Sequence, residues 1–190
     1  DPHPIFVLKK KNIKNPYILT PLSDKIELIK KELSSVIDIF VLISFTEEFS
    51  LISAKHFFEK IIDSFDPRDV VLGPDHGFGY KRKGNIGFLK QNYEYRLETS
   101  YLKMHKVNPK KINNTTYISS TLIRQYILNG EIKKANLMLG REYALMGNVV
   151  KGEGIGKKIN FPTINVAPKN KYQIIPSRGV YFVHLEIGNI

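Results

Sequence analysis

The sequence contains no cysteine, no apolar run long enough to span a bilayer, no internal repeat and no low-complexity tract. The lack of cysteine excludes disulfide bonds and thiolate metal sites, which fits a reducing cytosol and also any compartment where a protein does without them. A membrane-spanning helix needs about 18 apolar residues in succession. The opening residues 1–4 also lack the basic-then-apolar plan of a secretory signal peptide. We therefore expect a soluble protein.

The composition is that of a globular chain. Its 190 residues are 42% hydrophobic and 25% charged, enough for one large or two small cores. The formal net charge of +11 suggests a nucleic-acid partner, because clustered lysine and arginine neutralise phosphates and release counterions. The lysines, however, are mostly scattered pairs, with one denser run at 9–14 and no continuous stripe. Lysine-rich solvated faces explain the charge at least as well, and phosphate-bearing small molecules remain compatible.

The first part of the chain alternates between helical and strand patterns. Apolar residues recur at helical spacing from 22 to 33, and Asp24 with Glu27 resembles a capping box. Residues 37–43 are almost wholly apolar, as in a strand that is covered on both faces of a parallel sheet. This order predicts a helix followed by a buried strand.

A second helix and strand follow. Ser53 is the expected N-cap of a helix with an apolar stripe, and residues 69–72 have the pattern of another buried strand. Alternating helices and strands are typical of an open α/β sheet. In such sheets ligands bind beyond the carboxyl ends of the strands, so we expect a nucleotide site at the loop 73–87.

The character of the sequence changes near Gly140. A helix from about Ser120 and a short one at 131–139 precede this point, and Gly130 and Gly140 mark their ends. Beyond it, strands separated by turns predict a β-barrel-like module. We therefore expect domains at 1–140 and 141–190, with strands in the second at 143–150, 163–166 and 179–187.

Residues 73–84 combine glycines, two aromatic rings and three adjacent cations. Glycines permit close backbone approach, and the rings of Phe78 and Tyr80 could stack on a planar ligand. Composition alone fits an ordinary surface loop equally well, because glycine often follows a strand. The position beyond a predicted strand favours the functional interpretation.

Residues 118–124 place three hydroxyls at a helix start and an arginine one turn later. Free N–H groups, the helix dipole, hydroxyls and a guanidinium together suit a phosphate. Plain N-capping is the alternative. Capping needs one hydroxyl, whereas this segment offers Ser119, Ser120 and Thr121.

Residues 151–165 hold glycines at every second position, at 152, 154 and 156. Backbone amides there could line a phosphate, and Lys157 could balance its charge. Thr163 and Asn165 are hard oxygen ligands of the type that magnesium accepts. The segment is not a P-loop, because the Lys-Ser/Thr ending is missing. As a pattern it also fits a flexible hairpin.

These stretches occur in the same order in the bacterial bifunctional riboflavin kinase/FAD synthetases, and the chain resembles an internal part of that family. Asp-Pro-His-Pro at 1–4 looks like the segment after the family's first nucleotidylyltransferase motif, and 73–84 resembles its flavin-site loop. The Ser-Ser-Thr-x-x-Arg of 118–124 matches the second motif. Residues 152–165 are similar to the kinase stretch ending in Pro-Thr-x-Asn, and 177–181 resemble the strand after it.

The resemblance implies a Rossmann-like nucleotidylyltransferase domain with an open parallel sheet, followed by the start of a β-barrel riboflavin kinase domain. It implies a cytoplasmic enzyme that phosphorylates riboflavin to FMN with MgATP. The same enzyme then transfers an adenylyl group from ATP to FMN, giving FAD and pyrophosphate. Its partners would be flavins and ATP, rather than a membrane or a nucleic acid. Positioning and charge stabilisation carry such transfers, so no nucleophilic side chain is needed.

The resemblance also assigns roles to residues. Arg124 would be the catalytic cation of adenylyl transfer. The residues at the ATP phosphates would be Ser119, Ser120, Thr121 and Arg124 in adenylyl transfer, and Gly152, Gly154, Gly156 and Lys157 in the kinase reaction. Magnesium would bind at Thr163 and Asn165. The flavin would be bordered by Pro2, His3, Pro4, Asp75, Phe78 and Gly79.

The sequence departs from the family at several points. His76 stands where the family has Phe, which bears on flavin packing, and Asn160 replaces the usual Gly of the kinase loop. The resemblance puts the family's His-x-Gly-His motif upstream of residue 1 and the kinase's carboxylate base beyond Ile190. We therefore expect an incomplete fragment that holds parts of both sites. A nucleotidylyltransferase with another acceptor, a noncatalytic homologue and a basic nucleic-acid-binding module are the alternatives.

Overall fold

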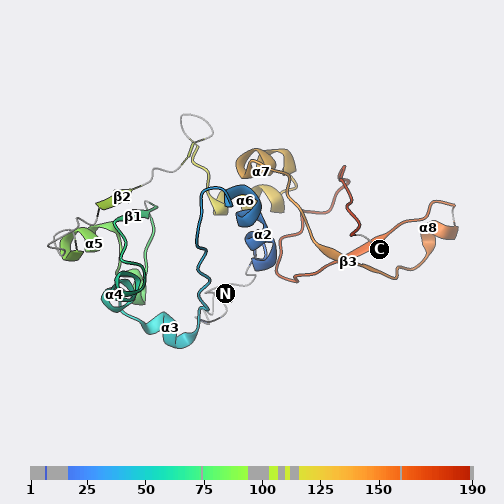
Figure 1. Ribbon diagram of the computed structural model, residues 1–190. Coiled ribbons are helices and arrows are strands. Elements are labelled where there is room, and N and C mark those ends of the chain that lie inside the picture. The colour runs from blue at the N-terminus through green and yellow to red at the C-terminus, as the bar shows by residue number, and fades with distance from the viewer. Residues whose placement is uncertain are drawn as a thin grey trace. The chain divides into compact units, whose positions relative to one another are not determined.

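The computed structural model describes residues 7, 17–73, 75–93, 103–106, 110–111, 116–158 and 160–188. The chain divides into two compact units (Figure 1). The first includes Ile37–Tyr117, and the second joins Asn15–Val36 to Ile118–Ile190. The second unit is therefore built from two separate parts of the sequence. In the described part of the chain, every helix is too short or too polar to cross a membrane.

The first unit combines short helices with a parallel pair of strands. Ring and side-chain packing between α4 and α5 forms its core: Phe58, Leu89 and Tyr93 are buried, and the rings of Phe58 and Tyr93 lie 4.8 Å apart. The elements are α3 (Glu47–Leu51), α4 (Ala54–Phe65), β1 (Asp69–Leu72), a 3₁₀ turn (Tyr80–Arg82), α5 (Ile86–Tyr93) and β2 (Lys103–Lys106).

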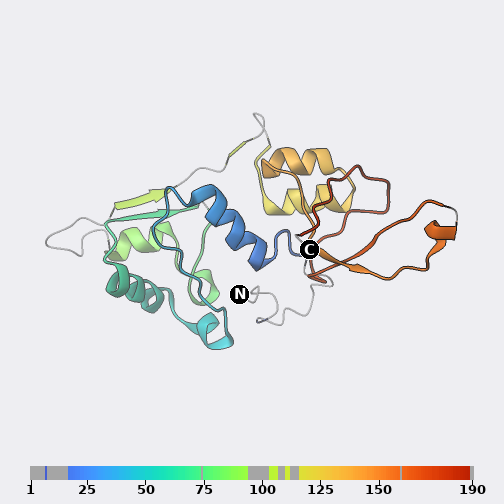
Figure 2. The same cartoon turned by 45° about the vertical axis from the view of Figure 1, so that its right-hand side comes forward.

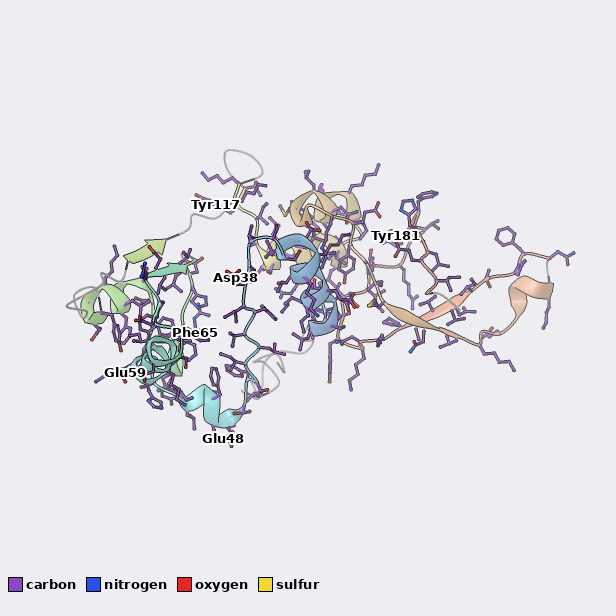
Figure 3. The ribbon with its side chains drawn as sticks, viewed as in Figure 1. Asp38, Glu48, Glu59, Phe65, Tyr117 and Tyr181 are labelled. Atoms are coloured by element: carbon purple, nitrogen blue, oxygen red, sulfur yellow. The ribbon has the colours of Figure 1, made fainter. Side chains whose placement is uncertain are left out.

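Helix α4 forms as predicted. The Ser53 side chain accepts a hydrogen bond from the His56 N–H at 3.1 Å. This bond satisfies one of the donors that a helix start leaves without an intrahelical partner. Ala54 and Phe58 of the apolar stripe are buried, whereas Phe65 at the far end is exposed (Figure 3).

Strand β1 also forms as predicted, but one of its faces is open. It pairs in parallel with β2, from Asp69 opposite Lys103 to Leu72 opposite Lys106. Val70 and Leu72 pack against the core of the unit, while Val71 on the other face is 60% exposed. The predicted burial of both faces is therefore wrong for this strand.

The second unit contains the remaining helices and an antiparallel pair of strands. Helices α6 and α7 lie side by side (Figure 2). Buried Ile123 and Ile127 of α6, Ala135 and Met138 of α7, and Ile174 form its core residues. The elements are α2 (Leu22–Leu33), α6 (Ser120–Leu128), α7 (Ile132–Leu139), β3 (Gly147–Val150), α8 (Ile155–Lys158) and β4 (Asn165–Pro168).

The glycines at 130 and 140 end α6 and α7 as predicted. Both adopt left-handed backbone, with φ of 78° and 70°. Gly140 is the C-cap of α7, and its N–H donates to the Asn136 carbonyl at 2.9 Å. Glycine takes this conformation without the steric penalty that a Cβ brings.

Two predicted strands are wrong. No strand occurs at 37–43 or 179–187 among the described residues, and their apolar side chains are largely exposed (Figure 3, near Asp38). Ile39 is 69% exposed and Phe182 is 96% exposed. Apolar composition favours a strand but does not supply the neighbouring backbone that a ladder requires. In the described residues β1 pairs with β2, and β3 with β4.

The helix predicted at 22–33 is confirmed, but its capping box is wrong. Pro21 is the N-cap and makes no side-chain capping bond, so Asp24 already lies within the first turn. There its carboxylate accepts a hydrogen bond from the Ser23 hydroxyl at 2.7 Å. A capping box would need Asp24 at the N-cap position, but the helix already begins at Leu22.

The predicted mixture of helices and strands is confirmed at this coarse level. The described sheets are two strand pairs, one parallel and one antiparallel, rather than an open parallel sheet and a barrel. Strand β3 lies inside the predicted 143–150, and β4 is displaced by two residues from 163–166. The loop predicted at 73–87 contains the 3₁₀ turn and the start of α5.

Candidate functional site

The glycine stretch 152–156 folds back onto the predicted magnesium ligands. Strands β3 and β4 run antiparallel with Val150 opposite Asn165, and α8 lies in their connection (Figure 2). A Cβ placed on Gly152 would collide with the Asn165 side-chain amide. Glycine at 152 is what lets this amide lie directly against the loop backbone.

Gly156 makes a second contact of the same kind. It is buried, and a Cβ there would collide with the Phe161 carbonyl and lie 3.0 Å from the Thr163 Oγ1. The Phe161 N–H donates to the Gly156 carbonyl at 2.8 Å. The structure therefore brings Gly152 next to Asn165 and Gly156 next to Thr163, as a single folded loop.

Left-handed residues flank α8. Gly154 has φ of 73° and Asn160 has φ of 56°. Glycine adopts this region freely, and asparagine tolerates it better than most residues do. The conformation accounts for Asn160 at a position where the resembled family has glycine. Lys157 lies within α8.

The loop offers oxygen donors of the kind that a hard cation prefers. Thr163 contributes a hydroxyl and Asn165 an amide oxygen, both exposed and both beside glycine backbone. The described residues contain no cluster of three or more His, Cys, Asp or Glu side chains that could hold a metal. Magnesium usually keeps several waters and takes phosphate oxygens, so two neutral donors suit it when a nucleotide supplies the rest.

At the start of α6, one of the three hydroxyls caps the helix and the other two do not. The Ser119 side chain accepts from the Leu122 N–H at 3.3 Å and is the N-cap. Ser120 and Thr121 are exposed at the same helix start. Arg124, one turn later, donates from Nε to the Tyr17 carbonyl at 3.1 Å. One hydroxyl thus caps the helix, and two more face solvent beside its N-terminal dipole.

The loop that follows β1 is tied into the aromatic core of the first unit. The Phe78 ring lies 5.5 Å from Phe57 and 6.1 Å from Phe58, between ring centroids. Gly79 has φ of 70°, and a Cβ there would lie 2.5 Å from the Ala54 backbone. Phe78 and Gly79 therefore have structural contacts that explain them without a ligand.

The polar residues of this loop lie at its surface. Asp75 is exposed, and its carbonyl accepts a hydrogen bond from Arg82 Nη2 at 2.5 Å. Lys81 and Arg82 are both left-handed, with φ of 54° and 58°. Non-glycine residues in this region store strain and are frequent at functional sites. The predicted flavin residues Pro2, His3 and Pro4 lie outside the described residues.

Sequence reasoning missed the residues that hold Arg124. Its partner is a backbone carbonyl 107 positions away. No residue type identifies such a partner, so the sequence carries no signal for it.

A cavity of about 480 Å³ in the second unit contains none of the predicted site residues. Its lining includes Ser23, Asp24, Lys169, Tyr172 and Gln173. Beside it, burial raises the pKa of Tyr143 to about 12, an effect partly offset by the Gln173 side chain and by Arg141.

Comparison with known families decides the assignment. Residues 1–122 match the FAD synthetase family. The chain belongs to this family. Residues 139–190 match the riboflavin kinase family, so the two matches follow in the order that the motifs predict. The FAD synthetase match includes the start of α6, and the riboflavin kinase match includes the loop from Gly152 to Asn165.

Bacterial relatives agree with both matches. The chain is 35% identical over 187 residues to a bifunctional riboflavin kinase/FMN adenylyltransferase of Buchnera aphidicola subsp. Schizaphis graminum, covering 97% of this chain and 56% of the relative. It is 34% identical to the enzyme of that name from Listeria monocytogenes, covering 99% of this chain and 56% of the relative. The chain thus spans about half the length of these curated relatives.

A solved structure shares the arrangement of the chain. A crystal structure described as a macrolide-efflux protein from Streptococcus pneumoniae superposes with a TM-score of 0.76 at 26% identity. The similarity covers 94% of this chain and 54% of that one.

Proposed function

We propose that the protein acts in FAD biosynthesis, by phosphorylating riboflavin to FMN and by transferring an adenylyl group from ATP to FMN. The observation that carries this proposal is that each family match contains a stretch whose backbone and side chains suit a phosphate. The helix start at 119–121 falls in the FAD synthetase match, and the glycine loop falls in the riboflavin kinase match.

For the kinase reaction, we assign the phosphate loop to Gly152, Gly154, Gly156 and Lys157. Backbone amides at the glycines would donate to phosphate oxygens, because no Cβ keeps the ligand away from them. Thr163 and Asn165 would hold Mg²⁺ through their oxygens, packed as they are against the same loop. The ion would supply charge neutralisation on the transferring phosphate.

For adenylyl transfer, we assign the ATP phosphates to Ser119, Ser120, Thr121 and Arg124. The exposed hydroxyls and helix dipole suit an anion, and Arg124 would act as the catalytic cation on the charge that develops as pyrophosphate leaves. We assign the flavin border to Pro2, His3, Pro4, Asp75, Phe78 and Gly79. The surface position of Asp75 supports a polar contact there, while Phe78 would present a ring that the core already holds in place.

We also propose the finer fold that these families imply. The parallel pair β1–β2 would belong to an open, Rossmann-like sheet, and the antiparallel pair β3–β4 to a β-barrel. The domain boundary would lie near residue 140, where α7 ends and the riboflavin kinase match begins. FMN, FAD, riboflavin and ATP would be the ligands.

The proposal is tested by following both products. The purified protein, expressed with any coding sequence that flanks this chain, is incubated with riboflavin, ATP and Mg²⁺, and FMN and FAD are separated by chromatography. Thr163→Ala should abolish most FMN formation while leaving FAD formation from supplied FMN. Arg124→Ala should do the reverse.

Matched controls separate these effects from general damage. Ser64→Ala removes an exposed hydroxyl, and Arg68→Ala removes an exposed guanidinium, each outside the assigned residues. Both controls should leave the two reactions unchanged. The absence of FMN and FAD in the wild-type incubation, or equal loss of both activities in each site variant, would overturn the proposal.

A further inference from the structure

Residues 17–20, which we call the strap, bond to α6 through Tyr17 and to residues 172–174 through Ile18. The Tyr17 carbonyl accepts the hydrogen bond from Arg124 Nε at 3.1 Å. The next residue, Ile18, donates its N–H to the Tyr172 carbonyl at 2.8 Å and accepts from the Ile174 N–H at 3.1 Å. The strap therefore connects Arg124 to the stretch that matches the riboflavin kinase family.

The far end of the strap has a second attachment. The Thr20 hydroxyl oxygen accepts a hydrogen bond from Arg141 Nη2 at 3.2 Å. Arg141 also donates from Nη1 to the Glu142 carbonyl at 3.0 Å. The guanidinium is thus held between the strap and its own neighbouring backbone, and a charged donor makes the stronger kind of hydrogen bond.

The backbone that receives the strap is itself fixed. Ile174 is fully buried, and its carbonyl accepts from the Tyr143 hydroxyl at 2.6 Å. Gln173 is 4% exposed and donates from Nε2 to the Ala144 carbonyl at 2.9 Å. Buried, hydrogen-bonded backbone of this kind moves little, so a segment bonded to it is held in one position.

Anchoring through Nε has a specific effect on Arg124. Among the described residues, its terminal Nη groups make no hydrogen bond, while Nε is engaged. The guanidinium is planar, so fixing Nε also fixes the plane in which the Nη donors lie. A long side chain ordered before binding loses less conformational freedom when a phosphate arrives.

We propose that the strap positions Arg124 for the phosphates of ATP, and that Thr20 and Arg141 are positioning residues for adenylyl transfer. This rests on the proposed role of Arg124. Its new element is that Arg141, in the riboflavin kinase match, serves the reaction of the other family.

The strap is tested with Thr20→Val, which keeps the side-chain shape and removes the acceptor. We expect kcat/KM for ATP in FAD formation from FMN to fall roughly three- to tenfold, the effect of losing one ordinary hydrogen bond, because the lost bond acts on ATP only through the strap. FMN formation from riboflavin should be unchanged, and Thr20→Ser should restore FAD formation. Ser23→Ala is the matched control, because its hydroxyl bonds to Asp24 and not to Arg141. Equal losses in both reactions, or no loss in either, would overturn the proposal.

A double-mutant cycle asks whether the strap works through Arg124. Arg124→Lys keeps the charge but lacks the Nε donor. If the strap acts by holding Arg124, Thr20→Val should cause no further loss in the Arg124→Lys background. A loss of the same size in both backgrounds would show a general structural effect and refute the positioning role.

A readout independent of activity completes the test. The Arg124 Nε–H resonance is identified as the signal lost in Arg124→Lys, and its exchange with water is measured. Thr20→Val should speed this exchange, and unchanged exchange would overturn the proposal. If the exchange responds but the wild-type protein makes no FAD from FMN, the proposed function has failed, and the positioning role in adenylyl transfer fails with it.

Discussion

Replacing Gly156 by alanine tests the packing of the glycine loop against Thr163. The new Cβ would collide with the Phe161 carbonyl and lie 3.0 Å from Thr163 Oγ1 and 3.2 Å from its Cγ2. Two of these atoms belong to the segment that we assign to magnesium. The segment must therefore move away from the loop for the methyl group to fit.

The cost follows from the contacts. Forcing one methyl group into a packed site costs about 1–3 kcal/mol. The displaced Phe161 carbonyl also moves the Phe161 N–H, which donates to Gly156 at 2.8 Å, and one such bond contributes roughly 1 kcal/mol. We expect the free energy of opening the loop to fall by about 1–3 kcal/mol. This figure already includes the weakened hydrogen bond.

The assay is amide hydrogen exchange at Phe161, because it reports local opening directly. A 1–3 kcal/mol loss speeds exchange roughly 5- to 150-fold where the loop closes again faster than the open amide exchanges. Gly154→Ala is the matched comparison: nothing lies within 4 Å of its Cβ position, but its φ is 73°. It should cost roughly 1 kcal/mol through backbone strain alone. Exchange at Phe161 that is unchanged in Gly156→Ala would refute the packing argument.

Three further predictions concern single residues. Ser119→Ala should destabilise α6 by about 0.5–2 kcal/mol through loss of its cap, and Ser120→Ala should have almost no effect, as measured by urea unfolding. Asn160→Val should cost about 1–2 kcal/mol at φ of 56°, whereas Asn160→Gly should be tolerated; thermal melts that rank Val as the more stable would contradict this. Burial holds the pKa of Tyr143 at about 12, above its usual 10.0, so the protonated hydroxyl stabilises the fold below pH 10, and this contribution disappears as pH rises toward 12. Tyr143→Phe should remove that pH dependence from the unfolding free energy, together with about 1 kcal/mol from the bond to Ile174, and an unaltered profile would refute the assignment.

Local sequence patterns predicted α2, α4, α6 and α7, but not α3, α5 or α8. Ser53 and Ser119 cap α4 and α6, and the glycines at 130 and 140 end α6 and α7, because capping depends on residues adjacent in the chain. Helix α5 was not predicted, although Asn85 offered a signal: its side-chain oxygen accepts from the Phe88 N–H at 2.9 Å. Asn85 lies in the stretch 73–87, whose glycines favour a loop.

Strands were predicted less reliably, for a physical reason. Residues 37–43 and 179–187 have the composition of strands, but no ladder forms there among the described residues. A helix satisfies its backbone internally, whereas a strand depends on a neighbour that its own sequence does not specify. β1 formed because β2 pairs with it, and the paired residues Asp69 and Lys103 are 34 positions apart in the chain.

The sequence by itself determined the family and the order of its motifs, because residue types at fixed spacings are local properties. From the glycines near Thr163 and Asn165, the sequence predicted only that other atoms can approach the backbone closely there. The tertiary structure decided which atoms approach: the Asn165 amide at Gly152, the Phe161 carbonyl and Thr163 at Gly156. It alone decided that Arg124 is held by the Tyr17 carbonyl, because every residue has a carbonyl and only folding selects the one in reach.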